Sequence, residues 1–311
     1  MKMIGEAMPI GEKSKRILTI AAAFGAAAVL VPWVQFAHGG SQGSPLVSST
    51  LQAESRQAEQ PSLYDTSSYD RLLRTYVNDQ GWVDYTGLAR EQTALNRFLE
   101  QLASVSPKEF KDESERLALW INAYNAYTLR DALDTVYGKH QSVRQVRGFF
   151  NGRKHAVAGE QLTLDDIEKR GRDLRDPRMH FAIVCASTSC PKLQRFAYTE
   201  KALDRQLDQA AREFLADPKR GLRFDREHNK LFVSPIFEWY AGDFTGASSG
   251  AGSFWARAKA TMSGNELLDF IAKYVPAEVT KGIRETPPAV HYFSYDWSLN
   301  SQDSHGPGGK P

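Results

Sequence analysis

Apolar residues recur at helical spacing along much of the chain. Leu95, Leu99 and Leu102 give one apolar face to an amphipathic stretch over residues 88–105. The longest helical pattern covers residues 113–137 and is stopped by Gly138. A capped helix start is predicted over residues 162–168, with Thr163 as the cap and Asp166 three residues on. Further helices are predicted over residues 69–77, 203–216 and 265–275.

Shorter apolar runs between these helices predict strands. The run over residues 179–184 predicts a buried strand, and residues 222–224 and 230–233 alternate like the two arms of a hairpin. Further extended segments are predicted over residues 81–85, 149–157 and 289–295. Since the order is mixed and helix outweighs strand, we predict an α+β fold: a single mixed domain, helix-rich with a small sheet.

The N-terminus has the pattern of a membrane helix or secretory signal. Basic residues, among them Lys13, Lys15 and Arg16, precede an apolar segment that reaches residue 37. The usual small residue of a cleavage site is replaced by Gln35, which favours an uncleaved, single-pass anchor with its basic end inside. In either case we expect the rest of the chain to be exported.

The remaining boundaries follow from composition. Residues 38–62 are rich in Gly, Ser, Gln and Ala and are predicted to be a flexible linker, and residues 301–311 a disordered tail. Between them, residues 63–300 are enough for one globular domain with a well-buried core. The net charge of +2 gives no support to nucleic-acid binding.

The two cysteines of the chain, Cys185 and Cys190, follow the predicted strand 179–184. Polar and reactive groups at the end of a core strand often form a site. In one hypothesis Cys185 is a nucleophile, and its base comes from elsewhere in the fold, with His155 and His291 as candidates. His180 is excluded as that base, because on an extended strand it lies ~16 Å from Cys185 and faces the other side.

In a second hypothesis Cys185 and Cys190 form a disulfide, which export favours and a turn of four intervening residues allows. An oxidised sulfur cannot attack a substrate, so the two hypotheses compete. His180 and Glu168 together with the cysteines are suitable zinc ligands by type, but the spacing of the cysteines is wider than usual. We predict no metal and no cofactor.

Two asparagines, Asn122 and Asn125, lie on one stripe of the long helix. A buried amide without partners costs roughly 1–3 kcal/mol, so we expect both to bond to the backbone of a neighbouring loop. The alternative is that one of them orients a catalytic group or contacts a ligand.

A group of acidic and aromatic residues follows the predicted hairpin: Glu238, Trp239 and Tyr240 with Asp243 and Phe244. Aromatic residues mostly pack in cores, but here they also suit a pocket wall with carboxylates at its rim, where Glu238 or Asp243 could act as acid or base. The segment 246–253, made of Gly, Ala and Ser, is predicted to be a spacer-like insertion beside it.

Several motifs in order resemble the family known as domain of unknown function 547 (DUF547). They are GWVDY (81–85), LWINAYNA (119–126), LTLDDIE (162–168), DPRMHFA (176–182), CAS and SCP (185–187 and 189–191), SPIFEWY (234–240) with DF (243–244), and YDWSLN (295–300). Lys169 departs from the family, in which many relatives have His. The resemblance implies a DUF547-like domain over residues 63–300 and export in bacteria, and brings no established reaction.

Two functions remain open. The first is a membrane-tethered hydrolase or acyl-transfer enzyme that faces the periplasm and uses Cys185 with a small-molecule, peptide or glycan substrate. The second is a non-enzymatic exported binding module in which the Cys185–Cys190 turn is structural. The sequence specifies neither protein partners nor an oligomeric state.

Overall fold

The computed structural model of the protein describes residues 63–244 and 264–305, all within one compact unit that spans residues 59–311. The predicted anchor, the linker and the insertion 246–253 lie outside the described residues. Among the residues that are described, no helix is long and apolar enough to cross a membrane.

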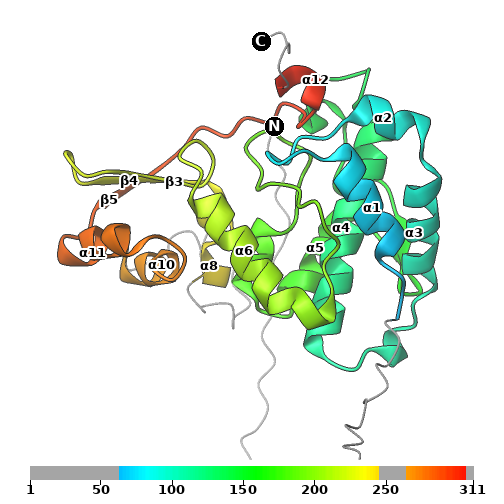
Figure 1. Ribbon diagram of the computed structural model, residues 1–311, viewed down its shortest axis with the longest axis horizontal. Helices are drawn as coiled ribbons and strands as arrows, with labels where there is room; N and C mark the ends of the chain where they lie inside the picture. The colour runs from blue at the N-terminus through cyan, green and yellow to red at the C-terminus, as the bar shows by residue number, and fades with distance from the viewer. Residues whose placement is uncertain (1–62, 245–263, 306–311) are drawn as a thin grey trace, which may run out of the picture. The chain divides into compact units, whose positions relative to one another are not determined.

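A buried central helix, α4 (Glu113–Thr135), organises the larger part of the fold. The Asp112 side chain caps its first turn by accepting a hydrogen bond from the Glu115 N–H. Apolar residues surround the helix, as expected for a helix that is covered on all sides. It packs against α3 (Thr93–Ser104) and α5 (Leu164–Arg172), as Figure 1 shows.

The helix prediction is largely confirmed, with one helix split in two. The stretch predicted as one helix over residues 88–105 is two, α2 (Tyr85–Arg90) and α3, because the chain turns at Glu91 and Gln92. The other helices are α1 (Ser67–Tyr76), α6 (Leu203–Leu215), α7 (Ile236–Trp239), α8 (Ala241–Phe244), α10 (Gly264–Ile271), α11 (Ala277–Glu285) and α12 (Gln302–His305). Short 3-10 turns are η1 (Pro107–Glu109), η2 (Val143–Gln145), η3 (Pro177–Phe181) and η4 (Glu200–Ala202).

Two small sheets complete the described fold. Strands β1 (His155–Val157) and β2 (Glu160–Leu162) form an antiparallel pair. Strands β3 (Leu222–Asp225) and β4 (Lys230–Val233) form the predicted hairpin, and β5 (Ala289–Tyr292) adds parallel to β4. The α+β, helix-rich class with small sheets is therefore confirmed.

The strand predicted over residues 179–184 is wrong. Asp176 accepts a hydrogen bond from the Arg178 N–H and Pro177 takes the first helical position, so the chain enters the turn η3 instead of extending. The apolar run is buried, as expected, but it forms a helical turn followed by an irregular segment instead of a strand. A short apolar run does not distinguish these cases.

The chain also continues in regular contacts past Asn300, the predicted end of the domain. Ser301 pairs with Val83 as an isolated bridge, and α12 follows. Residues 306–311 of the predicted tail lie outside the described residues.

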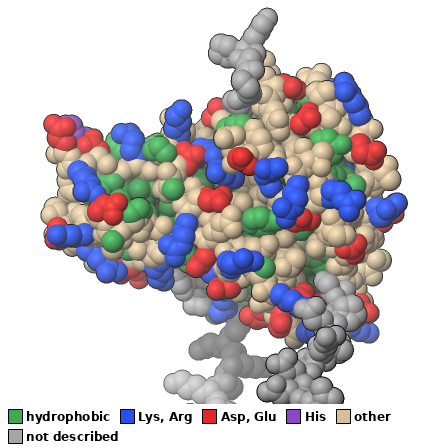
Figure 2. All heavy atoms as spheres, in the orientation of Figure 1, with side chains coloured by type: hydrophobic (Ala, Val, Ile, Leu, Met, Phe, Trp, Pro, Cys, Tyr) green, Lys and Arg blue, Asp and Glu red, His purple; other side chains and the backbone are tan. Residues whose placement is uncertain are grey.

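The buried apolar residues form two clusters. The larger cluster surrounds α4, and the smaller cluster joins the sheet β3–β4–β5 to α6, α7 and α10. In Figure 1 this sheet and α10 lie to the left of α4. Phe181 belongs to the smaller cluster and Ala182 to the larger one, so the segment before Cys185 runs where the two clusters meet. On the face in Figure 2, acidic and basic side chains are interspersed.

Candidate functional site

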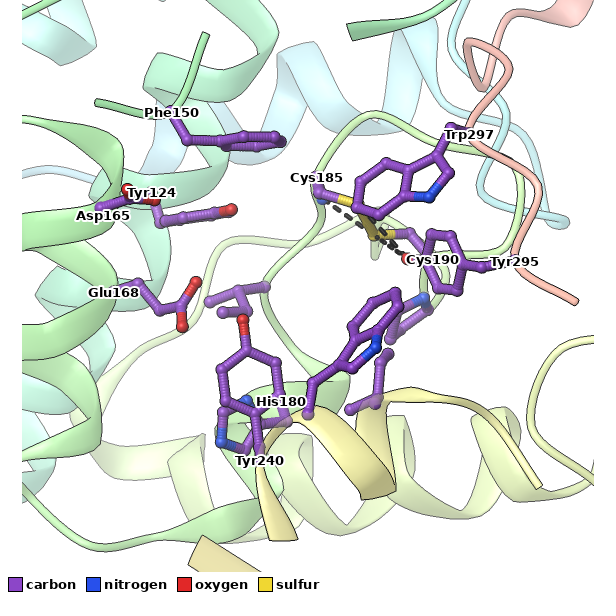
Figure 3. Close-up of a pocket in the computed structure, with 14 residues that line it drawn as sticks. Tyr124, Phe150, Asp165, Glu168, His180, Cys185, Cys190, Tyr240, Tyr295 and Trp297 are labelled. Carbon is purple, nitrogen blue, oxygen red and sulfur yellow. Dashed lines mark hydrogen bonds between the residues drawn. A yellow bond between two sulfur atoms is a disulfide. The ribbon is translucent and has the colours of Figure 1, made fainter. Parts of the chain in front are cut away.

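A cavity of about 160 Å³ lies where the two apolar clusters meet. Six of its fourteen lining residues are Phe, Tyr or Trp, and the others include three carboxyl or imidazole groups and the two cysteines. The lining residues are Tyr124, Phe150, Asp165, Glu168, His180, Ile183, Cys185, Cys190, Pro191, Ile236, Trp239, Tyr240, Tyr295 and Trp297. Figure 3 shows Glu168 and Tyr124 on one side of the cavity and the two cysteines with Tyr295 and Trp297 on the other.

Asn125 on α4 fixes the chain that leads into the cysteine turn. Its side-chain amide donates to the Ala182 carbonyl and accepts from the Val184 N–H, both at 2.9 Å. Ala186 then adopts a left-handed conformation with φ of 57°. A residue with a Cβ rarely adopts this conformation, which costs roughly 1–2 kcal/mol, so the tertiary contacts must hold the turn.

Cys185 and Cys190 are joined as a disulfide with a Cα–Cα separation of 6.3 Å. The Cys185 N–H donates to the Cys190 Sγ at 2.9 Å. The Tyr295 hydroxyl lies 3.4 Å from both sulfurs and accepts from the Ser187 hydroxyl at 3.3 Å, and the Ser187 oxygen lies 3.0 Å from Cys185 Sγ. Cys190 is 4% exposed, whereas Cys185 is only half-buried, so the two residues differ in access and in the backbone N–H that only Cys190 Sγ receives.

The opposite wall carries Glu168 on α5. Burial raises the pKa of this carboxyl to about 7, and the hydrogen bond from the Tyr240 hydroxyl and the charge of Arg172 only partly oppose this effect. The hydroxyl ends of Tyr124 and Tyr240 lie near the carboxyl (Figure 3). This end of the cavity therefore holds a carboxyl that exchanges a proton near neutral pH beside two hydroxyl groups.

Behind Tyr240 lies a hydrogen-bonded pair, His180 and Asp243, that supports this wall. His180 Nε2 lies 2.9 Å from Asp243 Oδ2, and the imidazole stacks on the Tyr240 ring with centroids 4.1 Å apart. Arg172 donates to both oxygens of Asp243, at 2.6 and 3.2 Å, and its guanidinium lies over the Tyr240 ring.

These contacts set the charges of the pair. Burial lowers the pKa of His180, so the ring is neutral at pH 7 and its Nε2–H donates to the carboxylate. Burial alone raises the pKa of Asp243, but the hydrogen bonds from His180 and Arg172 outweigh it and lower that pKa to about 2. Asp243 is therefore a constant negative charge that orients His180 and Arg172 around Tyr240.

Three aromatic rings form the third wall of the cavity. Trp239 stacks on Trp297 with centroids 5.8 Å apart, and Tyr295 lies against both rings at 4.8 and 4.6 Å. A second hollow of about 480 Å³ shares Phe150, Asp165, Trp239 and Trp297 with the first. The site therefore continues into a wider hollow along η2.

The structure brings five of the candidate residues to one cavity: Glu168, His180, Cys185, Cys190 and Trp239. His180 and Cys185 were expected on opposite faces of a strand. That expectation is wrong, because the η3 turn replaces the strand and both residues line the same cavity. Asp243 joins the site through His180.

The two histidines proposed as bases for Cys185 lie in other environments. His155 on β1 is buried, with its Nε2 at 2.9 Å from Asp131 Oδ2 and its ring against Tyr127. His291 on β5 is exposed and stacks on Phe232. Neither residue is among those that line the cavity.

The remaining candidates lie outside the cavity. Asn122 bonds to the Tyr198 backbone and to the Tyr64 hydroxyl, and Asn125 bonds to the segment before Cys185, so both asparagines bond to a neighbouring segment as expected. Glu238 is exposed. No group of three or more His, Cys, Asp and Glu side chains among the described residues is placed to hold a metal ion.

Sequence analysis included Tyr240 in the predicted pocket wall but did not place Tyr124, Arg172, Tyr295 or Trp297 at the site, which these residues complete. Tyr124 precedes Asn125, and Tyr240, Tyr295 and Trp297 stand in the motifs that carry the resemblance, so the signal was present. Arg172 had no such signal, because its partner Asp243 is 71 residues away.

Comparison with known proteins gives one family. The model of the family described as "Protein of unknown function, DUF547" matches residues 107–215. The match includes Tyr124, Glu168 and both cysteines, whereas the aromatic wall from Trp239 to Trp297 lies beyond it. No curated protein and no solved structure matches the chain.

Proposed function

This chain is a DUF547 domain-containing protein, and we propose that it is an exported binding module for a small organic molecule with a flat apolar face and one hydrogen-bonding group. The observation that carries the proposal is the cavity itself, with aromatic rings on one side and Glu168 on the other.

The size and lining of the cavity limit the occupant. A volume of about 160 Å³ is close to the roughly 150 Å³ that accommodates a benzene-sized molecule in an apolar protein cavity. Trp239, Tyr295 and Trp297 offer ring faces that favour a flat ligand, and the adjoining hollow leaves room for a substituent.

The polar end determines which group the ligand presents. Below its pKa of about 7 Glu168 can donate or accept a hydrogen bond, and above it the carboxylate only accepts. With the hydroxyls of Tyr124 and Tyr240 beside it, this end suits an amine, hydroxyl or amide. A ligand amine gains a charge-assisted hydrogen bond as Glu168 ionises.

The pairing of the cysteines favours a binding module over a thiol-dependent hydrolase. A sulfur in a disulfide cannot attack a carbonyl carbon, and both histidines considered as its base lie elsewhere. The disulfide also supports the proposal of export, since disulfides persist in oxidising compartments. We propose that residues 17–37 tether the protein to the periplasmic side of the inner membrane or act as its signal.

Tryptophan fluorescence tests binding, because Trp239 and Trp297 line the cavity. Benzylamine, phenol and benzamide serve as probes, because they carry an amine, a hydroxyl and an amide on the same flat ring. We expect benzylamine to bind, and Tyr240→Phe to weaken it about tenfold through the lost hydroxyl. Tyr292→Phe, on the exposed β5, is the matched control. Equal affinities of the two variants and the native chain contradict the proposal.

The tethered location is tested separately by fusing alkaline phosphatase, which is active only after export, to the C-terminus. Phosphatase activity that is lost when residues 1–37 are deleted supports export. A full-length fusion that shows no phosphatase activity contradicts export.

A second function, hydrolysis by general acid–base catalysis, is favoured by Glu168 specifically. A carboxyl with a pKa of about 7 can both donate and accept a proton at neutral pH, which is how catalytic acids are tuned. The test is the turnover of aryl ester or aryl glycoside probes. Turnover that is abolished by Glu168→Gln and preserved in Glu238→Gln supports this function. Equal turnover in the two variants contradicts it.

A further inference from the structure

We infer that the Cys185–Cys190 disulfide captures small-molecule thiols by thiol–disulfide exchange, with Cys185 as the sulfur attacked and Cys190 as the leaving group. This activity goes beyond the proposed function and requires only that a thiol reaches the cavity. It is carried by the position of the disulfide in the cavity wall and by the unequal surroundings of its two sulfurs.

The first observation concerns access. Both cysteines line the cavity, but Cys185 is half-buried whereas Cys190 is 4% exposed. An incoming thiolate must approach one sulfur in line with the sulfur–sulfur bond, so the more accessible atom is attacked and the more buried atom departs. In Figure 3 the disulfide lies beside Trp297 and Tyr295, which favour a thiol attached to a ring.

The second observation concerns the leaving group. The Cys190 Sγ accepts hydrogen bonds from the Cys185 N–H at 2.9 Å and from the Tyr295 hydroxyl at 3.4 Å. Both donors stabilise the negative charge that develops on this sulfur as the bond breaks. The Tyr295 hydroxyl also lies 3.4 Å from Cys185 Sγ, and the Ser187 hydroxyl lies 3.0 Å from that sulfur. The backbone N–H of Cys185 is therefore the donor that Cys190 receives and Cys185 does not.

The reaction balances without a further reactant. The ligand thiolate forms a bond with Cys185 Sγ, the Cys185–Cys190 bond breaks, and its electron pair stays on Cys190, which then takes a proton from solvent. One disulfide is exchanged for another. A second molecule of the thiol can attack the ligand sulfur, which releases an oxidised ligand dimer and leaves both cysteines reduced.

Benzyl mercaptan in excess is the probe, because it carries a ring on an alkyl thiol, whose thiolate is a stronger nucleophile and a poorer leaving group than an aryl thiolate. The full-length chain, purified without reductant, is mixed with the probe under native conditions, quenched with N-ethylmaleimide and digested for mass spectrometry. We expect benzyl mercaptan on Cys185 and N-ethylmaleimide on Cys190. The reverse assignment, or an adduct formed only in denaturant, overturns the inference.

Tyr295→Phe tests the leaving-group step. Because a hydrogen bond to a charged group is lost, we expect the rate of adduct formation to fall about tenfold. Tyr292→Phe, on the same segment but exposed, is the matched control and keeps the native rate. An unchanged rate in Tyr295→Phe overturns the assignment of Tyr295. Since the assay detects the covalent adduct, its failure is distinct from a failure of benzylamine to bind.

Discussion

Asn125 Oδ1 accepts a 2.9 Å hydrogen bond from the backbone N–H of Val184, the residue directly before Cys185. The same amide donates to the Ala182 carbonyl. The central helix thereby fixes the segment that leads to the disulfide. Asn125 does not line the cavity, but it sets the position of Cys185, which does.

Asn125→Ala removes both bonds and leaves a buried N–H and a buried carbonyl without this partner. We expect a loss of about 1–3 kcal/mol in the free energy of unfolding, measured with urea. Asn122→Ala, which frees the backbone of Tyr198 instead, is the matched control with a loss of similar size. The two variants differ at the disulfide: only Asn125→Ala is expected to change the rate at which benzyl mercaptan reacts. Equal rates in both variants contradict this role of Asn125.

Glu168→Gln changes the pH dependence of stability. The folded protein holds the Glu168 proton up to a pKa of about 7, whereas the ordinary value is 4.5. The folded state therefore binds more protons than the unfolded state within this range, and the native chain loses stability as pH rises from 4.5 to 7. The shift corresponds to roughly 3 kcal/mol, so Glu168→Gln is expected to be the more stable protein at pH 8.

The comparison with the variant is necessary because His180 acts in the opposite direction. Its pKa is lowered by burial from 6.5, so it makes the folded state more stable as pH rises towards 6.5. His180 is present in both proteins, and the difference between their urea-unfolding free energies isolates Glu168. If the difference in unfolding free energy between the two proteins does not vary between pH 4.5 and 8, Glu168 does not hold a proton in the folded state over this range.

Asp243→Asn tests the pair behind Tyr240. The substitution keeps the shape of the side chain but removes the charge that Arg172 and His180 face. We expect a loss of about 1–3 kcal/mol at pH 7, because hydrogen bonds to a charged group are worth about that much. Glu238→Gln, an exposed carboxylate on the same segment, is expected to change stability by less than about 0.5 kcal/mol.

The pH range follows from the lowered pKa of Asp243. Its contribution is complete above the ordinary value of 3.8 and is lost as pH falls through about 2. The difference between the native chain and Asp243→Asn should therefore decrease as pH falls from about 4 and disappear below about pH 2. A difference that persists there assigns the loss to packing instead.

The parts of the fold that depend on near neighbours were predictable. The α5 start was predicted from Thr163 and Asp166, and both bonds of that capping box are present. The hairpin β3–β4 followed from alternation over a few residues. The strand prediction for residues 179–184 was wrong because any buried segment, helical or extended, gives a short apolar run. The residues that start the helical turn, Asp176 and Pro177, stand just before this run.

The site depends on contacts that are remote in sequence. Tyr295 reaches Cys190 across 105 residues, and Asp243 reaches Arg172 across 71. A periodic pattern identifies buried faces, but it does not specify which remote side chains meet in a cavity. The cysteine turn and Glu168 were therefore candidates from the sequence, whereas the phenol donor of the turn and the position of Glu168 opposite it required the fold.

Loss of the disulfide is expected to cost about 2 kcal/mol, the value for closing so short a loop in the unfolded chain. Cys185→Ser, Cys190→Ser and the double variant should lose similar amounts, since each removes the same cross-link. Urea unfolding of the native chain with and without a phosphine reductant gives an independent value. The double variant is the control, because the reductant has no bond to cleave in it. A native chain whose unfolding midpoint is the same with and without the reductant contradicts a closed pair, because Cys185 and Cys190 would then already be reduced.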